Sequence, residues 1–63
     1  MANQLPYKVE CKRPEMAYAE LIAAFDCQRA AEAYAGECAL ANMAFTYRVK
    51  RGRRVLQEFR PNT

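Results

Sequence analysis

The chain has 63 residues, of which 52% are hydrophobic and 27% are charged, and its formal net charge is +3. A chain of this length forms one small domain, residues 1–63, which buries only about 60% of the surface that its unfolded form exposes. It contains no histidine, no serine and only two glycines, which excludes an imidazole-assisted nucleophile and a glycine-rich phosphate loop. We therefore expect no catalytic residue, no cofactor and no enzymatic activity.

The three cysteines, Cys11, Cys27 and Cys38, lack the spacing of a zinc site, and an odd number cannot pair completely within one chain. We expect no metal site and three reduced, partly buried thiols that pack as small apolar residues; an intermolecular disulfide is the alternative. Without a metal or disulfides, self-association is the remaining way to stabilise a domain with so small a core. A symmetric homodimer and a monomer are therefore both possible.

No stretch of the chain approaches the roughly 20 apolar residues that a membrane-spanning helix needs. Residues 1–6 lack the basic stretch and apolar run of a signal peptide. We therefore expect a cytoplasmic protein that does not contact a membrane.

Residues 7–13 alternate between apolar and polar side chains, with Tyr7, Val9 and Cys11 on one side. This period of two predicts a half-buried strand. The sequence from Arg13 to Met16 suits a type I turn, because Pro14 presets the backbone angle at its second position.

Residues 15–42 are rich in alanine, but their apolar positions change face at Asp26, which argues against one long helix. Asp26 is a good N-cap, so we predict a helix from Cys27 to about Asn42, with Asn42 in a left-handed C-cap. Residues 17–25 then form either a strand paired with residues 7–13 or a separate short helix. We favour the strand.

Residues 45–50 and 54–59 are predicted to form a second hairpin, with Gly52 supplying a positive backbone angle at its turn. Pairing Val49 with Val55 gathers the apolar side chains on one face of this hairpin and places Phe45 opposite Phe59.

The predicted fold is therefore α+β, with strands and helix in the order ββαββ. We expect an antiparallel four-stranded sheet with one helix packed on one face. The expected core joins residues of three of the strands to four side chains of the helix. These residues are Tyr7, Val9, Cys11, Phe45, Tyr47, Val49, Val55 and Phe59 on the strands, with Ala30, Ala31, Tyr34 and Cys38 on the helix.

Positive charge is concentrated near the C-terminus. Residues 1–46 carry four basic and six acidic side chains, whereas residues 47–63 carry six basic and one acidic side chain. Five of these bases lie within seven residues around the second turn: Arg48, Lys50, Arg51, Arg53 and Arg54. Like charges this close repel one another unless they are solvated or meet an anionic partner, so we expect this loop to bind a partner.

Tyr18 is a further candidate partner-binding residue, because Tyr18 and Tyr7 could stack on bases if both lay on an open sheet face beside the basic loop. The basic loop itself suits either the phosphates of a nucleic acid or an acidic protein surface. A solvated turn that blocks edge-to-edge sheet pairing is the plainer alternative.

Residues 25–35, followed by the sequence Tyr47-Arg48-Val49, resemble a recurrent pattern of short phage and prophage accessory proteins. In these proteins a strand ends in Phe-Asp, a helix opens with an Ala-x-x-Tyr-Ala face, and a Tyr-Arg-Val strand follows. The resemblance spans about residues 18–59 and assigns no site residue. It implies the size class that includes anti-CRISPR proteins and other inhibitors of host machinery, which occupy a surface of a host complex.

Three hypotheses follow from these observations. The first is a phage or prophage protein that docks on a host protein complex through an acidic surface of that complex and inhibits or modulates it. The second is a nucleic-acid-binding module that uses residues 48–54, and the third is a self-assembling structural module.

Overall fold

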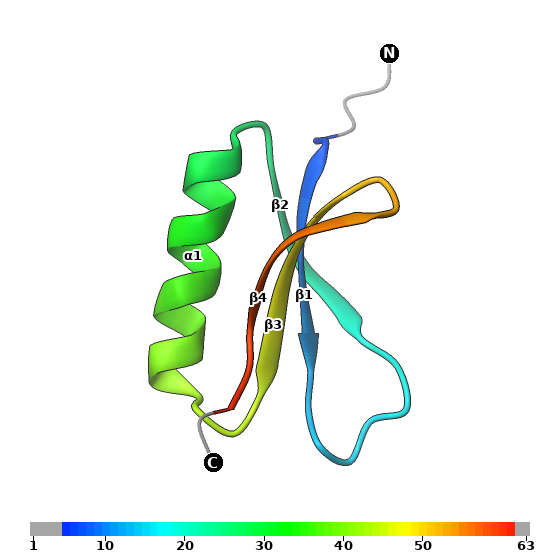
Figure 1. Ribbon diagram of the computed structural model, residues 1–63, viewed down its shortest axis with the longest axis vertical. Coiled ribbons are helices and arrows are strands. Elements are labelled where there is room, and N and C mark those ends of the chain that lie inside the picture. Colours follow the sequence, from blue (N-terminus) through cyan, green and yellow to red (C-terminus); the bar gives the residue numbers. More distant parts are fainter. Residues whose placement is uncertain (1–4, 62–63) are drawn as a thin grey trace.

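The structure, a computed structural model, describes residues 5–61. In chain order it contains β1 (Tyr7–Lys12), β2 (Glu20–Phe25), α1 (Gln28–Ala41), β3 (Thr46–Arg51) and β4 (Arg54–Phe59). The strands form one antiparallel sheet in the order β2-β1-β3-β4, and α1 packs on one face of it, mainly against β3 (Figure 1). The predicted ββαββ fold is confirmed.

Within residues 5–61, no helix has both the length and the apolar character needed to span a bilayer. The prediction that residues 1–6 are not a signal peptide falls mostly on residues outside the described range.

The first hairpin is formed by β1 and β2, as the alternation of residues 7–13 predicted. Tyr7 lies opposite Phe25 and Val9 lies opposite Ala23. The alternative of a short helix for residues 17–25 is therefore wrong, although β2 begins only at Glu20. In the connecting loop the N–H of Met16 donates to the carbonyl of Arg13 at 3.0 Å, which closes the predicted turn.

The helix begins one residue later than predicted, and Asp26 is not its cap. Cys27 is the N-cap residue, with extended φ and ψ angles of −135° and 130°, and its carbonyl accepts the N–H of Ala31 at 3.1 Å. Because the chain is still extended at Cys27, the Asp26 carboxylate lies one position too early to cap the first turn. Among the side chains of residues 5–61, none caps this end of α1.

The helix ends at the predicted place by a different geometry. Asn42 is the C-cap, but its φ of −132° lies outside the left-handed region that was predicted. Its backbone N–H donates to the carbonyl of Cys38 at 2.9 Å, and its own carbonyl accepts the N–H of Phe45 at 3.1 Å. These two bonds turn the chain from α1 into β3.

The central strands of the sheet, β1 and β3, are far apart in the sequence, with β2 and α1 between them. Val9 lies opposite Val49, and Cys11 lies opposite Tyr47. All four of these side chains are buried, and the helix adds two buried alanines, Ala31 and Ala35. Small side chains on this face of α1 allow its backbone to approach the sheet closely. The prediction of Ala30 as a core residue is wrong, because Ala30 is exposed.

The predicted register of the second hairpin is wrong. Arg51 lies opposite Arg54, Lys50 lies opposite Val55, and then the register shifts so that Val49 lies opposite Gln57. The turn therefore has two central residues, Gly52 and Arg53, which is the favoured length for a tight hairpin.

A bulge at Leu56 then corrects the phase of β4. Beyond it, Phe59 lies opposite Tyr47 rather than opposite Phe45. Leu56 packs against the core, whereas Val55, which was predicted to be a core residue, is 47% exposed.

The two valines give a test of this register. Val49→Ala should lower the free energy of unfolding by about 2 kcal/mol, because it leaves a cavity among fully buried side chains. Val55→Ala should change it by less than about 0.5 kcal/mol, because the side chain is half exposed. Urea unfolding measures both values, and equal losses would contradict the observed register.

Candidate partner-binding surface

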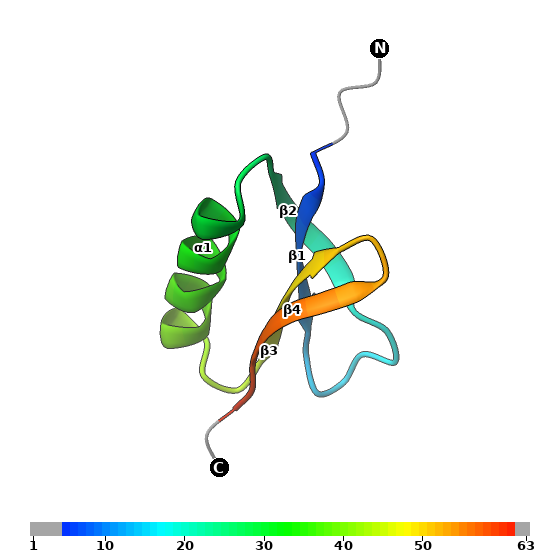
Figure 2. The same cartoon turned by 45° about the horizontal axis from the view of Figure 1, so that its top comes forward.

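The tip of the β3–β4 hairpin is a two-residue turn that carries arginines on both sides. Gly52 has a φ of 63°, and no other described residue has a positive φ. A positive φ at the first central position alone fits a type II′ turn, whose twist matches that of the two strands. The tip bends away from α1, as two views of the ribbon agree (Figures 1 and 2).

Arg51 is held in place by an aromatic side chain of β1. Its guanidinium carbon lies 5.2 Å from the centre of the Tyr7 ring, and its Nη1 donates to the Tyr7 hydroxyl at 3.3 Å. A guanidinium stacked on a ring keeps its remaining N–H groups available to an anion.

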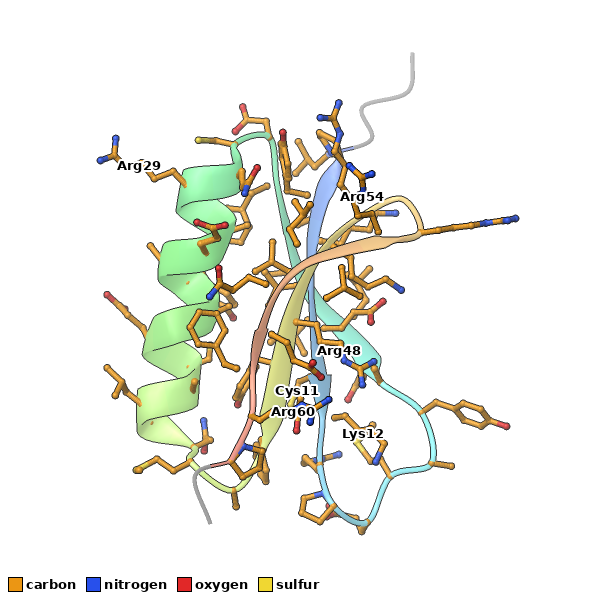
Figure 3. The ribbon with its side chains drawn as sticks, viewed as in Figure 1. Cys11, Lys12, Arg29, Arg48, Arg54 and Arg60 are labelled. Atoms are coloured by element: carbon orange, nitrogen blue, oxygen red, sulfur yellow. The ribbon has the colours of Figure 1, made fainter. Side chains whose placement is uncertain are left out.

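Arg53 and Arg54 are exposed, and within residues 5–61 neither forms an ion pair. Arg54 lies directly opposite Arg51, an arrangement in which like charges repel. Figure 3 shows Arg54 beside the N-terminal end of β1.

An open groove of about 820 Å³ lies beside this tip. Lys8, Arg51 and Arg54 supply its charges, and none of the described residues that line it carries a carboxylate. Its other lining residues are Leu5, Pro6, Gln28, Gly52 and Leu56. We call Lys8, Arg51, Arg53 and Arg54 together the cationic tip.

The other two predicted loop bases point to the uncovered face of the sheet, where acids neutralise them. Arg48 Nε donates to Glu58 Oε2 at 3.1 Å, and Lys50 Nζ lies 3.6 Å from Glu10 Oε2. All four side chains are only partly exposed. The structure therefore divides the five predicted residues into two paired bases and three arginines at the tip.

Glu58 holds two arginines, since Arg60 Nε also lies 3.3 Å from its Oε1. The hydrogen bond from Arg48, followed by the charge of Arg60, lowers the pKa of Glu58 below its usual value. Figure 3 shows Arg48 and Arg60 in the same region of the sheet, well away from Arg54.

Tyr18 lies far from the cationic tip. It is 83% exposed in the loop between β1 and β2, at the end of the sheet opposite the turn at Gly52. Tyr7 is near the tip, but its ring lies under Arg51. The structure therefore does not bring Tyr18 and Tyr7 together as a stacking surface for bases.

The three cysteines differ in burial, although all three were predicted to be partly buried. Cys11 is buried and Cys38 is half-buried, whereas Cys27 is exposed, which corrects that prediction. Among residues 5–61, no three side chains of the kinds that bind metals are grouped closely enough to hold an ion.

Sequence reasoning missed three residues that determine the charge of this surface: Lys8, Glu10 and Glu58. Glu10 and Lys50 are brought together by the pairing of β1 with β3, and Glu58 meets Arg48 only in the shifted register of β4. Local sequence patterns predicted hairpins but contained no signal for the β1–β3 pairing. The order β2-β1-β3-β4 would have revealed the pair between Glu10 and Lys50, and the bulge in β4 would have revealed the pair between Glu58 and Arg48.

A scan against models of protein families, a search of curated proteins and a search of solved structures each found no match to this chain.

From the ion pairs of Glu58 with Arg48 and Arg60, we expect the stability of the fold to depend on pH. Because the pKa of Glu58 is lower in the folded chain than in the unfolded chain, its contribution is complete above the unfolded pKa. This contribution is lost as the pH falls through the folded pKa.

Arg48→Met should raise the pKa of Glu58 and make the loss of stability in acid less steep. Arg53→Met is the matched control, because Arg53 has no acidic partner among the described residues. NMR titration of the Glu58 carboxyl and urea unfolding across the acid range measure the two effects. An unchanged Glu58 pKa in Arg48→Met would contradict the assignment.

Proposed function

We propose that this chain is a non-enzymatic binding protein that docks on an acidic surface of a partner protein through its cationic tip. The observation that supports this proposal is the collection of Lys8, Arg51 and Arg54 around one groove, which no carboxylate of residues 5–61 lines. Their mutual repulsion is relieved by an anionic partner, because no acid of the described chain pairs with the tip.

The distribution of the remaining charges favours a protein over a nucleic acid as the partner. A phosphate backbone is best followed by a continuous stripe of bases. Here Glu10 and Glu58 interrupt the bases on the uncovered face and pair with Lys50 and Arg48. The unneutralised charge is thus compact, which matches an acidic patch on a protein.

The resemblance to short phage and prophage accessory proteins extends this proposal. The partner is then a protein complex of the bacterial host, met in the host cytoplasm. Occupying its acidic surface would inhibit or modulate that complex, as anti-CRISPR proteins and other host inhibitors do. This part of the proposal rests on the resemblance alone.

A charge-reversal pair tests the docking surface. Arg53→Glu with Arg54→Glu should abolish capture of a specific partner from a bacterial lysate by the tagged protein, because both side chains are exposed at the tip. Arg13→Glu with Arg29→Glu is the matched control, since it makes the same change in net charge at exposed positions elsewhere. Figure 3 shows Arg29 pointing away from the sheet.

Quantitative mass spectrometry of the captured proteins compares the three forms, and circular dichroism verifies that each is folded. The proposal predicts a partner that wild type and the control share and the tip variant loses. Equal capture by all three forms, or no specific partner for wild type, would contradict it.

A second candidate is nucleic-acid binding, which the shape of the hairpin favours. A two-stranded ribbon that ends in a tight turn can enter the major groove of DNA. With Arg48 and Lys50 held by acids, three arginines remain at the tip for phosphates.

Binding of duplex DNA should then weaken with salt at a log–log slope of about −3, corresponding to three phosphate contacts. Fluorescence anisotropy of a labelled duplex across a range of salt concentrations measures this slope. Affinity that does not change with salt, or no binding at low salt, would exclude the nucleic-acid alternative.

A further inference from the structure

A second groove, of about 790 Å³, lies between α1 and the end of β4 and shares no lining residue with the groove beside the hairpin tip. Its lining is largely apolar and includes two of the most exposed apolar side chains of the protein, Leu40 at 78% and Met43 at 60%. Phe45 and Phe59 are half-buried beneath them. We call this feature the helix groove.

Gly36, in the middle of α1, lines the helix groove without being required by the fold of one chain. A Cβ placed on it would meet the Phe59 ring at 3.7 Å, which is an ordinary van der Waals distance. Glycine in a helix interior lowers stability relative to alanine. The absence of a side chain at Gly36 leaves more room in the groove beside the Phe59 ring than alanine would.

The two walls of the helix groove carry opposite charges. Glu37, on α1, is exposed and has no ion-pair partner among residues 5–61. Arg60, just beyond β4, is 76% exposed and shares Glu58 with Arg48, which already neutralises that carboxylate. Each wall therefore has a charge available to a molecule that enters the groove.

We propose that the helix groove is the interface of a twofold-symmetric homodimer. In such an interface the same patch of both copies meets itself, so residue contacts occur in reciprocal pairs. Placing the α1 wall of one copy against the β4 wall of the other forms two equivalent pairs between Glu37 and Arg60. Leu40 and Met43 of each copy then fill the groove of the other, where Gly36 leaves room beside the Phe59 ring.

A second copy fits better than an unrelated apolar segment because the groove is complementary in charge to itself. The cationic tip shares no residue with the helix groove, so a dimer presents two free tips. The homodimer is therefore independent of the proposed function, and either can fail without the other.

The molecular mass in solution tests the dimer. Sedimentation equilibrium of the purified chain at micromolar to millimolar concentration should show a rise from the mass of one chain to twice that mass. Leu40→Glu should weaken dimerisation at least about a hundredfold, because it places an unpaired carboxylate in the interface.

Leu21→Glu is the matched control, since Leu21 is 55% exposed on the opposite edge strand, β2, and it should dimerise as wild type does. A monomer at every concentration would overturn the proposal and leave the groove to a different partner. Equal weakening by Leu40→Glu and Leu21→Glu would overturn it too.

Two further variants separate the interface from effects on the fold. Gly36→Ala should raise the thermal stability of the monomer, because alanine favours a helix more than glycine does. The same variant should weaken dimerisation. A purely structural role for Gly36 does not produce these two opposite effects. Glu37→Arg and Arg60→Glu should each weaken dimerisation about tenfold, and their combination should restore it to within about threefold of wild type. A combination no stronger than either single variant would overturn the proposed pairing.

Discussion

The pairing of β1 with β3 is the constraint on which the rest of this structure depends. It places Val9 against Val49 at the centre of the sheet, where both side chains are fully buried. The same pairing forms the surface on which α1 packs, because Ala31 and Ala35 form one core cluster with these valines. A small domain has little area to bury, so its core depends on the few residues that this pairing brings together.

The elements of this fold could be predicted because each has a local signal. Alternation around Val9 indicated a strand, the change of apolar face at Asp26 indicated a break, and Gly52 marked a turn. The details that failed depend on tertiary packing. Asp26 is displaced from the cap because Cys27 remains extended, and the bulge at Leu56 exists because Phe59 has to reach the helix face.

The candidate surface was predictable as a location but not as a set of residues. A run of bases in the sequence does not show which of them meet acids, because Glu10 and Glu58 approach Lys50 and Arg48 only through strand pairing. Folding thus sorts one charged run into a neutralised part on the open face and an unneutralised part at the tip. The second part is the one that can contribute to binding, since no acid of the described part of the chain compensates its charge.

The central position of β1 also affects how the chain folds. β1 precedes the other three strands in the sequence, and β2 follows it closely enough for the first hairpin to form from local contacts. The other edge of β1 pairs with β3, which comes after the entire helix in the sequence. Until β3 arrives, Val9 and Cys11 have no strand beside them on that side, and α1 lacks the strand against which it mainly packs. Closing this long loop is the entropically costly step, so formation of the β1–β3 pair should limit the rate of folding and complete the core in one cooperative event.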